Sequence, residues 1–202
     1  MMKRLLDRIF LSPKNWEWPI SQATLDLLHK EGNWDSLDSI DEVAQCAVIV
    51  GYVHYLFVSP TILDVGCGRG RLLKLFDTTR LKSYVGIDLS VEAIRQAESL
   101  AIEKATFEVA NLEEWNPTER FDSIIFNDSL CYAQEHPANV LSRYTHALNK
   151  DGVVIVSLYR YGNHRMLWKN IEKHFVTINS TTVKNRKRQV WDIRVLRQRQ
   201  AA

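Results

Sequence analysis

Apolar and polar positions along the chain change their spacing near residue 60. Before that point the apolar positions recur at helical intervals, which predicts helices over 1–10, from 21 or 24 to the stop at Gly32, and over 41–57. Ser59-Pro60 ends the third helix, because the residue before a proline disfavours the helical conformation. Residues 1–60 are therefore predicted to form a helical segment.

Beyond residue 60, short apolar runs alternate with amphipathic stretches. They predict strands over 61–65, 83–87, 106–109, 123–127 and 153–158, and helices over 69–78, 90–103, 137–148 and 164–173. Strands that alternate with helices form a parallel sheet covered on both faces. Two further runs, 176–183 and 189–196, are separated by a polar turn alone, so they must pair as an antiparallel hairpin.

The first predicted strand leads into a turn with three glycines, Gly66, Gly68 and Gly70. Glycine allows close approach of the backbone to a ligand and a positive φ. The N-terminus of the helix expected behind the turn offers free N–H groups and a favourable dipole. This strand, turn and helix are typical of a unit that holds a nucleotide.

The composition fits one globular domain of 202 residues, with 46% hydrophobic and 25% charged residues. A net charge of +2 marks neither a nucleic-acid binder nor a membrane binder. The longest apolar stretch, 44–60, is too short and mixed to span a bilayer, and the N-terminus lacks the features of a signal peptide. Cys46, Cys67 and Cys131 lie far apart, which argues against a metal site and a disulfide framework. We expect a reduced, cytoplasmic protein with no metal and no membrane attachment.

Five sequence blocks resemble the class I S-adenosylmethionine-dependent methyltransferases. They are Leu63–Gly70, Val85–Ser90, Phe107–Leu112, Phe121–Asn127 and Leu148–Val154. The resemblance covers about residues 60–197. It implies a doubly wound, Rossmann-like α/β fold in three layers, with a seven-stranded, mostly parallel sheet whose last strand is antiparallel. It also implies S-adenosyl-L-methionine as the cofactor and S-adenosyl-L-homocysteine as its product, with 61–202 as the cofactor-binding core and 1–60 as a lid within the same domain.

Asp88 ends the second predicted strand, where a carboxylate accepts hydrogen bonds from both ribose hydroxyls in other nucleotide-binding α/β units. The resemblance implies that Leu89 lies against the adenine, that Asn111 faces its amino group and that Asn127 faces the methionine part. It also implies that Asp64 holds the glycine turn near the cofactor's amino group. A structural acid at Asp64 and a turn residue at Asn111 remain alternatives. The full set of expected cofactor-binding residues is Asp64, Gly66, Cys67, Gly68, Gly70, Asp88, Leu89, Asn111, Leu112 and Asn127.

A nicotinamide-dependent dehydrogenase is the main competing interpretation of the glycine turn. Its fingerprint is G-x-G-x-x-G, whereas the third glycine comes one residue earlier here and Arg71 follows it. The early glycine and the C-terminal hairpin both favour the methyltransferase.

Methyl transfer from a sulfonium is an in-line displacement, so positioning of the acceptor supplies much of the rate. A general base is needed only where the acceptor arrives protonated. The candidate bases are therefore weak: His136, His164 and Tyr132, with surface or helix-capping roles favoured for the two histidines. The aromatic residues expected in the substrate pocket are Trp16, Trp18, Trp34, Tyr132 and Tyr159.

The predicted reaction is methylation of an oxygen or nitrogen of a small metabolite. One alternative is an RNA or protein methyltransferase that uses the basic stretch 184–199, which carries seven basic residues and one acid. A solvated turn and tail explain that stretch better. Asn127–Leu130 also departs from the N-P-P-Y segment of enzymes that methylate nucleic-acid bases. A cofactor-binding protein without catalysis is a further alternative, and the oligomeric state stays open.

Overall fold

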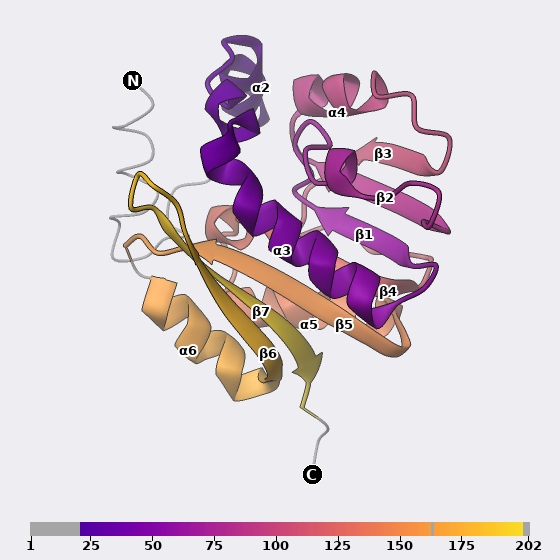
Figure 1. The fold of residues 1–202 in the computed structure, drawn as a ribbon, viewed down its shortest axis with the longest axis vertical. Helices are drawn as coiled ribbons and strands as arrows, with labels where there is room; N and C mark the ends of the chain where they lie inside the picture. Colours follow the sequence, from indigo (N-terminus) through magenta and orange to yellow (C-terminus); the bar gives the residue numbers. More distant parts are fainter. Residues whose placement is uncertain (1–20, 163, 200–202) are drawn as a thin grey trace.

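A computed structural model describes residues 21–162 and 164–199 of the chain. Its centre is a seven-stranded sheet in the order β3-β2-β1-β4-β5-β7-β6 (Figure 1). The strands are β1 (Thr61–Val65), β2 (Ser83–Asp88), β3 (Ala105–Val109), β4 (Phe121–Asn127), β5 (Leu148–Tyr159), β6 (Phe175–Lys184) and β7 (Val190–Gln198). The pairs among β1 to β5 are parallel, and β7 runs antiparallel to both β5 and β6. The predicted doubly wound sheet with an antiparallel last strand is confirmed.

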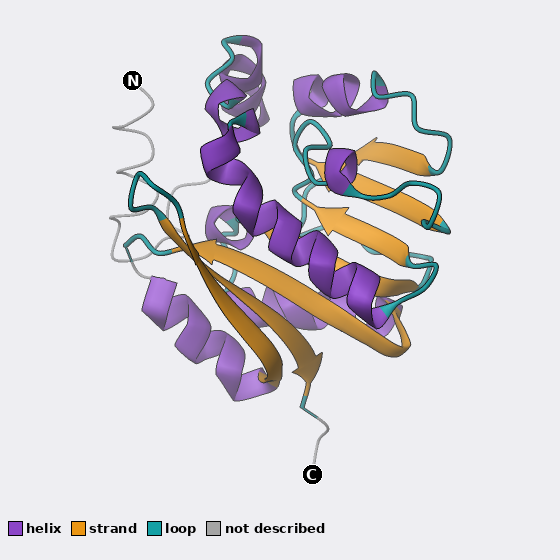
Figure 2. Ribbon diagram, in the orientation of Figure 1, coloured by secondary structure: helices purple, strands orange, loops and turns teal. Residues whose placement is uncertain are grey.

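Helices cover both faces of the sheet (Figure 2). They are α2 (Gln22–Lys30), α3 (Ile40–Leu56), α4 (Val91–Glu98), α5 (Pro137–Tyr144) and α6 (His164–His174). Helix α3 lies across one face, while α5 and α6 pack on the other and α4 packs against β2 and β3. The expected helix over 1–10, and Trp16 and Trp18, lie outside the described residues.

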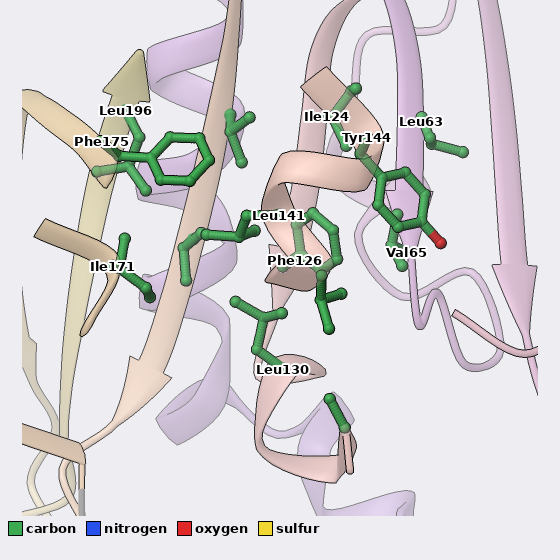
Figure 3. Packing of buried hydrophobic residues seen from close by; sticks show 14 of the residues in the cluster. Leu63, Val65, Ile124, Phe126, Leu130, Leu141, Tyr144, Ile171, Phe175 and Leu196 are labelled. Atoms are coloured by element: carbon green, nitrogen blue, oxygen red, sulfur yellow. The ribbon is translucent and has the colours of Figure 1, made fainter. Parts of the chain in front are cut away.

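Alternating side chains of the central strands divide the core into two apolar clusters. On β1, Leu63 and Val65 point to the face covered by α5 and α6, where Figure 3 shows them with Phe126 and Leu141. Ile62 points to the opposite face, against α3. A strand buried on both faces reads as a continuous apolar run, which is why this part of the chain was predictable.

Helix α3 forms a layer of the domain core. Cys46, Ile49 and Val53 have no exposed surface and pack against Ile62 of β1 and Ile155 of β5. Part of the N-terminal 60 residues is therefore built into the fold.

The helix expected over 69–78 is wrong. The chain there forms turns and a short 3-10 helix, Leu73–Leu75, because Gly70 has a φ of +69° and Phe76 is extended. Leu72, Leu73 and Phe76 are nevertheless buried. Their spacing therefore correctly indicated side chains that face the core, although the backbone that carries them is not helical. The helices expected over 90–103 and 137–148 also end early, at Glu98 and Tyr144.

Candidate active-site cavity

A cavity of about 670 Å³ opens at the carboxyl ends of the parallel strands. Asp64, Asp88, Asn127 and Tyr159 line it from β1, β2, β4 and β5. Helix α2, the 3-10 turn η1 (Asp35–Asp38) and the start of α3 line it from the opposite side. This is where ligands bind in open α/β sheets.

The glycine turn is held tightly against its neighbours. The N–H groups of Gly66 and Cys67 donate to the carbonyl of Ile87 at 2.8 and 2.9 Å. A Cβ at Gly66, whose φ is +79°, would lie 2.4 Å from the Cβ of Ser129, whereas a Cβ at Gly68 would meet no atom within 4 Å. Gly66 therefore serves close packing, and Gly68 leaves open space beside the cavity.

Asp88 joins the glycine turn to the start of α4. Its Oδ2 accepts from the Gly68 N–H and its Oδ1 accepts from the Ser90 N–H, both at 2.9 Å. Burial raises the pKa of Asp88, and these two donors oppose that rise. Each carboxylate oxygen keeps a free lone pair, so a vicinal diol has two acceptors in fixed positions.

Four polar atoms of cavity-lining residues are buried without a hydrogen-bond partner: His29 Nδ1, Trp34 Nε1, Asp64 Oδ1 and Asn127 Oδ1. Buried polar atoms are nearly always hydrogen-bonded, so an unpaired set in one cavity points to a polar ligand.

Asp64 lies at the floor of the cavity. The Tyr84 hydroxyl donates to its Oδ2, and its Oδ1 is one of the unpaired atoms. Burial raises the pKa of Asp64 to about 7, and the nearby carboxylate of Asp88 adds to the rise. Without a ligand, this carboxylate is therefore costly to ionise.

This shift predicts a pH dependence of stability. The folded pKa is above the unfolded one, so the folded state binds more protons between about pH 4 and pH 7, and stability falls as pH rises through that window. The variant Asp64→Asn keeps an acceptor for Tyr84 and is expected to lose part of this fall. Urea unfolding of both proteins at about pH 5 and pH 8 measures the effect. An equal fall in the two proteins would exclude Asp64 as its source.

Arg69 connects the glycine turn to the segment that covers the cavity. Its guanidinium donates to Asp35 at 2.6 Å, to Asp38 at 3.2 Å and to the Trp34 carbonyl at 3.2 Å. Asp26 of α2 accepts from the Ser90 hydroxyl at 2.6 Å. Helix α2 and η1 are thus attached to the start of α4 and to the glycine turn, the two segments whose N–H groups bind Asp88.

Asp128 organises the other end of the cavity. It adopts a φ of +55°, and its Oδ1 accepts from the Tyr159 N–H at 2.8 Å. Its Oδ2 accepts from Trp191 Nε1 at 2.9 Å. The carboxylate thus joins the ends of β4 and β5 to β7. A non-glycine residue in the left-handed region costs free energy, and such residues cluster at functional sites.

The structure brings most of the predicted site residues together. All of the expected cofactor-binding residues line the cavity except Gly70, whose Cβ position is 2.8 Å from Leu100. Trp34, Tyr132 and Tyr159 also line it. Their roles toward a ligand stay predictions. Asn111 also acts as a turn residue, because its Oδ1 accepts from the Glu113 N–H at 3.0 Å.

The two candidate histidines are not part of this cavity. His136 is the residue before α5, and its carbonyl accepts from the N–H groups of Asn139 and Val140. His164 begins α6 and lines a separate, smaller cavity with Arg160 and Trp168.

Sequence reasoning missed several lining residues: His29, Glu42, Gln45, Arg71, Gln189 and Trp191. Glu42 and Gln45 could have been found from the sequence, because they are polar residues three positions apart on the buried side of an apolar helix. Trp191 had none, because it reaches the cavity through the pairing of β7 with β5.

The sheet, the glycine turn and the fixed carboxylate of Asp88 define a doubly wound α/β domain of the kind that binds nucleotide-like ligands. A family described as a methyltransferase domain matches residues 36–199. The protein belongs to this methyltransferase family, and the family prediction is confirmed.

Solved structures share the fold at low sequence identity. The N-methyltransferase NodS from Bradyrhizobium japonicum, in complex with S-adenosyl-L-homocysteine, matches with a TM-score of 0.76 and 13% identity, over 89% of this chain and 98% of its own. The [4+2]-cyclase SpnF matches with a TM-score of 0.73 and 13% identity, over 91% and 97%. The 1,6-didemethyltoxoflavin-N1-methyltransferase from Burkholderia thailandensis, with bound 1,6-didemethyltoxoflavin and S-adenosylhomocysteine, matches with a TM-score of 0.71 and 19% identity, over 89% and 87%. No curated protein sequence matches the chain.

Within 21–162 and 164–199, no helix is long and apolar enough to cross a membrane. In the same ranges, no three metal-ligating side chains gather in a way that could hold a metal ion.

Proposed function

We propose that this protein transfers a methyl group from S-adenosyl-L-methionine to an oxygen or nitrogen of a small molecule, mainly by holding the reactants in line. The observation that carries the proposal is the carboxylate of Asp88. Backbone N–H groups fix both of its oxygens beside the glycine turn, and a free lone pair on each suits the two hydroxyls of a ribose.

The other cavity residues fit the remaining parts of this cofactor. Leu89 and Leu112 offer apolar contact for the adenine. The unpaired Oδ1 atoms of Asp64 and Asn127 suit an ammonium group, and the Arg71 guanidinium beside the glycine turn suits a carboxylate. The cavity thus has one group of the right sign for each charge of an amino-acid zwitterion.

Bound S-adenosylmethionine supplies a methyl group on a sulfonium whose leaving thioether is neutral. The chain has little bond chemistry to add, so its task is orientation and the exclusion of water. Residues of η1 and α3 lie over the strand ends and serve the second task.

Two observations favour a small acceptor. The cavity volume of about 670 Å³ falls in the usual range for small-molecule sites. Two basic side chains of the hairpin turn are also engaged in ion pairs within the chain, because Arg186 and Lys187 pair with Asp41 of α3 at 2.6 and 2.9 Å. The toxoflavin enzyme is solved with bound 1,6-didemethyltoxoflavin, which agrees with a small acceptor for that protein. The cyclase SpnF is a reminder that this fold also hosts other chemistry.

Thermal unfolding with S-adenosylmethionine, S-adenosylhomocysteine or NAD tests the proposal. A ligand that binds only the folded state raises the melting temperature by mass action. We expect both adenosyl ligands to raise it and NAD to leave it unchanged. Transfer of labelled methyl from the cofactor to a metabolite fraction separates the enzyme from a cofactor-binding protein without catalysis. A shift with NAD alone would overturn the assignment.

A further inference from the structure

We propose that the acceptor is an amine that enters the cavity as a cation, and that the carboxylate of Asp128 binds its ammonium group and removes the proton before methyl transfer. This inference rests on the proposed function and narrows it to N-methylation. It concerns the acceptor end of the cavity, which we define as Glu42, Asp128, Tyr159, Tyr161 and Trp191.

The charges that line the cavity leave two carboxylates for the acceptor. Asp64 and Arg71 match the ammonium and the carboxylate of the cofactor, and Asp88 matches its ribose. Arg69 is paired with Asp35 and Asp38, and Glu113 accepts from the Glu135 N–H. Glu42 and Asp128 then remain at the acceptor end. The positive charge of Arg71 attracts both carboxylates. When Arg71 pairs with the carboxylate of the bound cofactor, it stabilises Glu42 and Asp128 less. An acceptor cation is the complementary partner.

The position of Asp128 suits a group that contacts the acceptor. The Tyr159 N–H and the Trp191 indole N–H each bind one carboxylate oxygen, at 2.8 and 2.9 Å, so the group is held in one orientation. The Gln45 side chain donates a further hydrogen bond to the carboxylate, and these three donors leave a lone pair for an ammonium group. Burial raises the pKa of Asp128 to about 7, where a carboxylate is an effective general base at neutral pH.

Aromatic rings form the wall beside this carboxylate. The rings of Tyr159 and Tyr161 are stacked, with centroids 6.1 Å apart and an interplanar angle of 10°. The Trp191 ring lies 5.3 Å from that of Tyr159. Aromatic faces attract ammonium groups, so this wall favours a cation over a neutral alcohol and disfavours a carboxylate.

Two carboxylates of the acceptor end, Glu42 and Asp128, can titrate, and burial raises the pKa of both. We assign the base to Asp128 because the Tyr159 and Trp191 N–H groups fix its orientation. The side chains that face it come from α3, the glycine turn, the turn after β4, β5 and β7: Gln45, Cys46, Arg71, Cys131, Tyr132, Tyr159 and Trp191. Burial raises the pKa of Cys46 to about 11 and raises those of Cys131, Tyr132 and Tyr159 above their usual values. Among these side chains, Arg71 is the one that carries charge at neutral pH besides Asp128.

The proposed step balances. The ammonium passes one proton to a carboxylate oxygen of Asp128 and becomes a neutral amine. Its lone pair forms the new N–C bond as the C–S bond breaks, and the bonding pair stays on sulfur. The methylated ammonium carries the positive charge that the sulfonium loses, and Asp128 releases its proton to water after the products leave.

A matched series of probes tests the charge preference. Benzylamine, 2-phenylethylamine and 3-phenylpropylamine are compared with the alcohol and the carboxylate of the same carbon skeleton. Melting temperatures are measured on the wild-type protein saturated with S-adenosylhomocysteine, and methyl transfer is measured separately with labelled S-adenosylmethionine as the donor. At least one amine is expected to raise the melting temperature and to accept labelled methyl at a rate about 10-fold or more above its partners. Equal responses within every series, including none, would overturn the inference.

The variant Asp128→Asn tests the base. For the best amine, kcat/KM is expected to fall about 100-fold or more, and its rise through about pH 7 is expected to disappear. Asp151→Asn, which changes an exposed acid at the start of β5, is the matched control. A variant that keeps its pH profile and rate would overturn the role of Asp128.

Binding of S-adenosylhomocysteine to the wild type tests the proposed function separately from the inference about the acceptor. If the wild type does not bind S-adenosylhomocysteine, the proposed function is overturned. If it binds this ligand but shows no preference for amines, only the inference about the acceptor is overturned. The same measurement on Asp128→Asn reports whether the variant is folded, since Asp128 does not contact the ribose end of the cavity.

Discussion

Replacing Asp88 with alanine is expected to weaken binding of S-adenosylhomocysteine at least about 100-fold. A hydrogen bond to a charged group is worth about 1.5–3 kcal/mol, and two such bonds to the ribose would be lost together. The substitution also removes the acceptor for the Gly68 and Ser90 N–H groups, which loosens the glycine turn itself. Isothermal titration calorimetry on the purified variant measures the loss.

A second ligand separates the ribose contact from the loosening of the turn. S-adenosylhomocysteine that lacks the 2′-hydroxyl should bind the wild type more weakly than the intact ligand. The Asp88→Ala variant should discriminate little between them, because the group that reads the hydroxyl is gone. Asp151→Ala should behave as the wild type does. Full discrimination by Asp88→Ala would mean that the ribose lies elsewhere.

The second large effect concerns stability and contrasts two glycines of the same turn. Gly66→Ala is expected to destabilise the fold by about 2–5 kcal/mol. A left-handed φ costs an alanine about 1–2 kcal/mol, and forced overpacking about 1–3 more. Both apply here, since φ is +79° and the new Cβ would lie 2.4 Å from the Cβ of Ser129. Such a loss is a large part of the 5–15 kcal/mol that holds a typical domain together.

Gly68→Ala is the matched comparison. Its φ is +54°, and a new Cβ meets no atom within 4 Å, so the loss of stability should stay near 1–2 kcal/mol. The methyl group would instead occupy the open space at the cavity, and affinity for S-adenosylhomocysteine should fall. Urea unfolding and calorimetry on both variants give the two readouts. Equal destabilisation by the two substitutions would contradict the assignment of Gly66 to packing.

Adding Ser129→Gly to Gly66→Ala tests the steric part alone. The double variant removes the Cβ that the new methyl group would strike, so it should regain part of the lost stability. The recovery is expected to be incomplete, because the backbone cost at position 66 remains and the Ser129 hydroxyl no longer donates to the Val65 carbonyl.

The strands of the sheet could be predicted from the sequence because the central strands are short apolar runs between clear turn residues. It failed over 69–78, where Leu72, Leu73 and Phe76 have helical spacing but are buried by an irregular chain. Periodicity records which side chains face the core, and the positive φ of Gly70 decides that the backbone is not helical.

The part of the cavity around Asp88 and the glycine turn could also be predicted from the sequence. The acceptor end could not. Asp88 and the glycine turn lie at the ends of the strands that present them, so the sequence predicted that they lie together, and their roles toward a cofactor stay predictions. Glu42 and Trp191 reach the same cavity from α3 and β7, and only tertiary packing brings them beside Asp128. Long-range contacts of this kind leave no local pattern.

The placement of β7 between β5 and β6 has a consequence for how the chain folds. Without β7, strand β5 would be the edge of the parallel sheet. Its unpaired backbone groups would then be exposed along an apolar run, Val153 to Val156, that is buried in the folded protein. The pairing that protects this edge is also the one that delivers Trp191 to Asp128. Protection from edge-to-edge association and completion of the acceptor end therefore depend on the same strand pairing. Variants that slow this pairing should aggregate before they lose affinity for the cofactor.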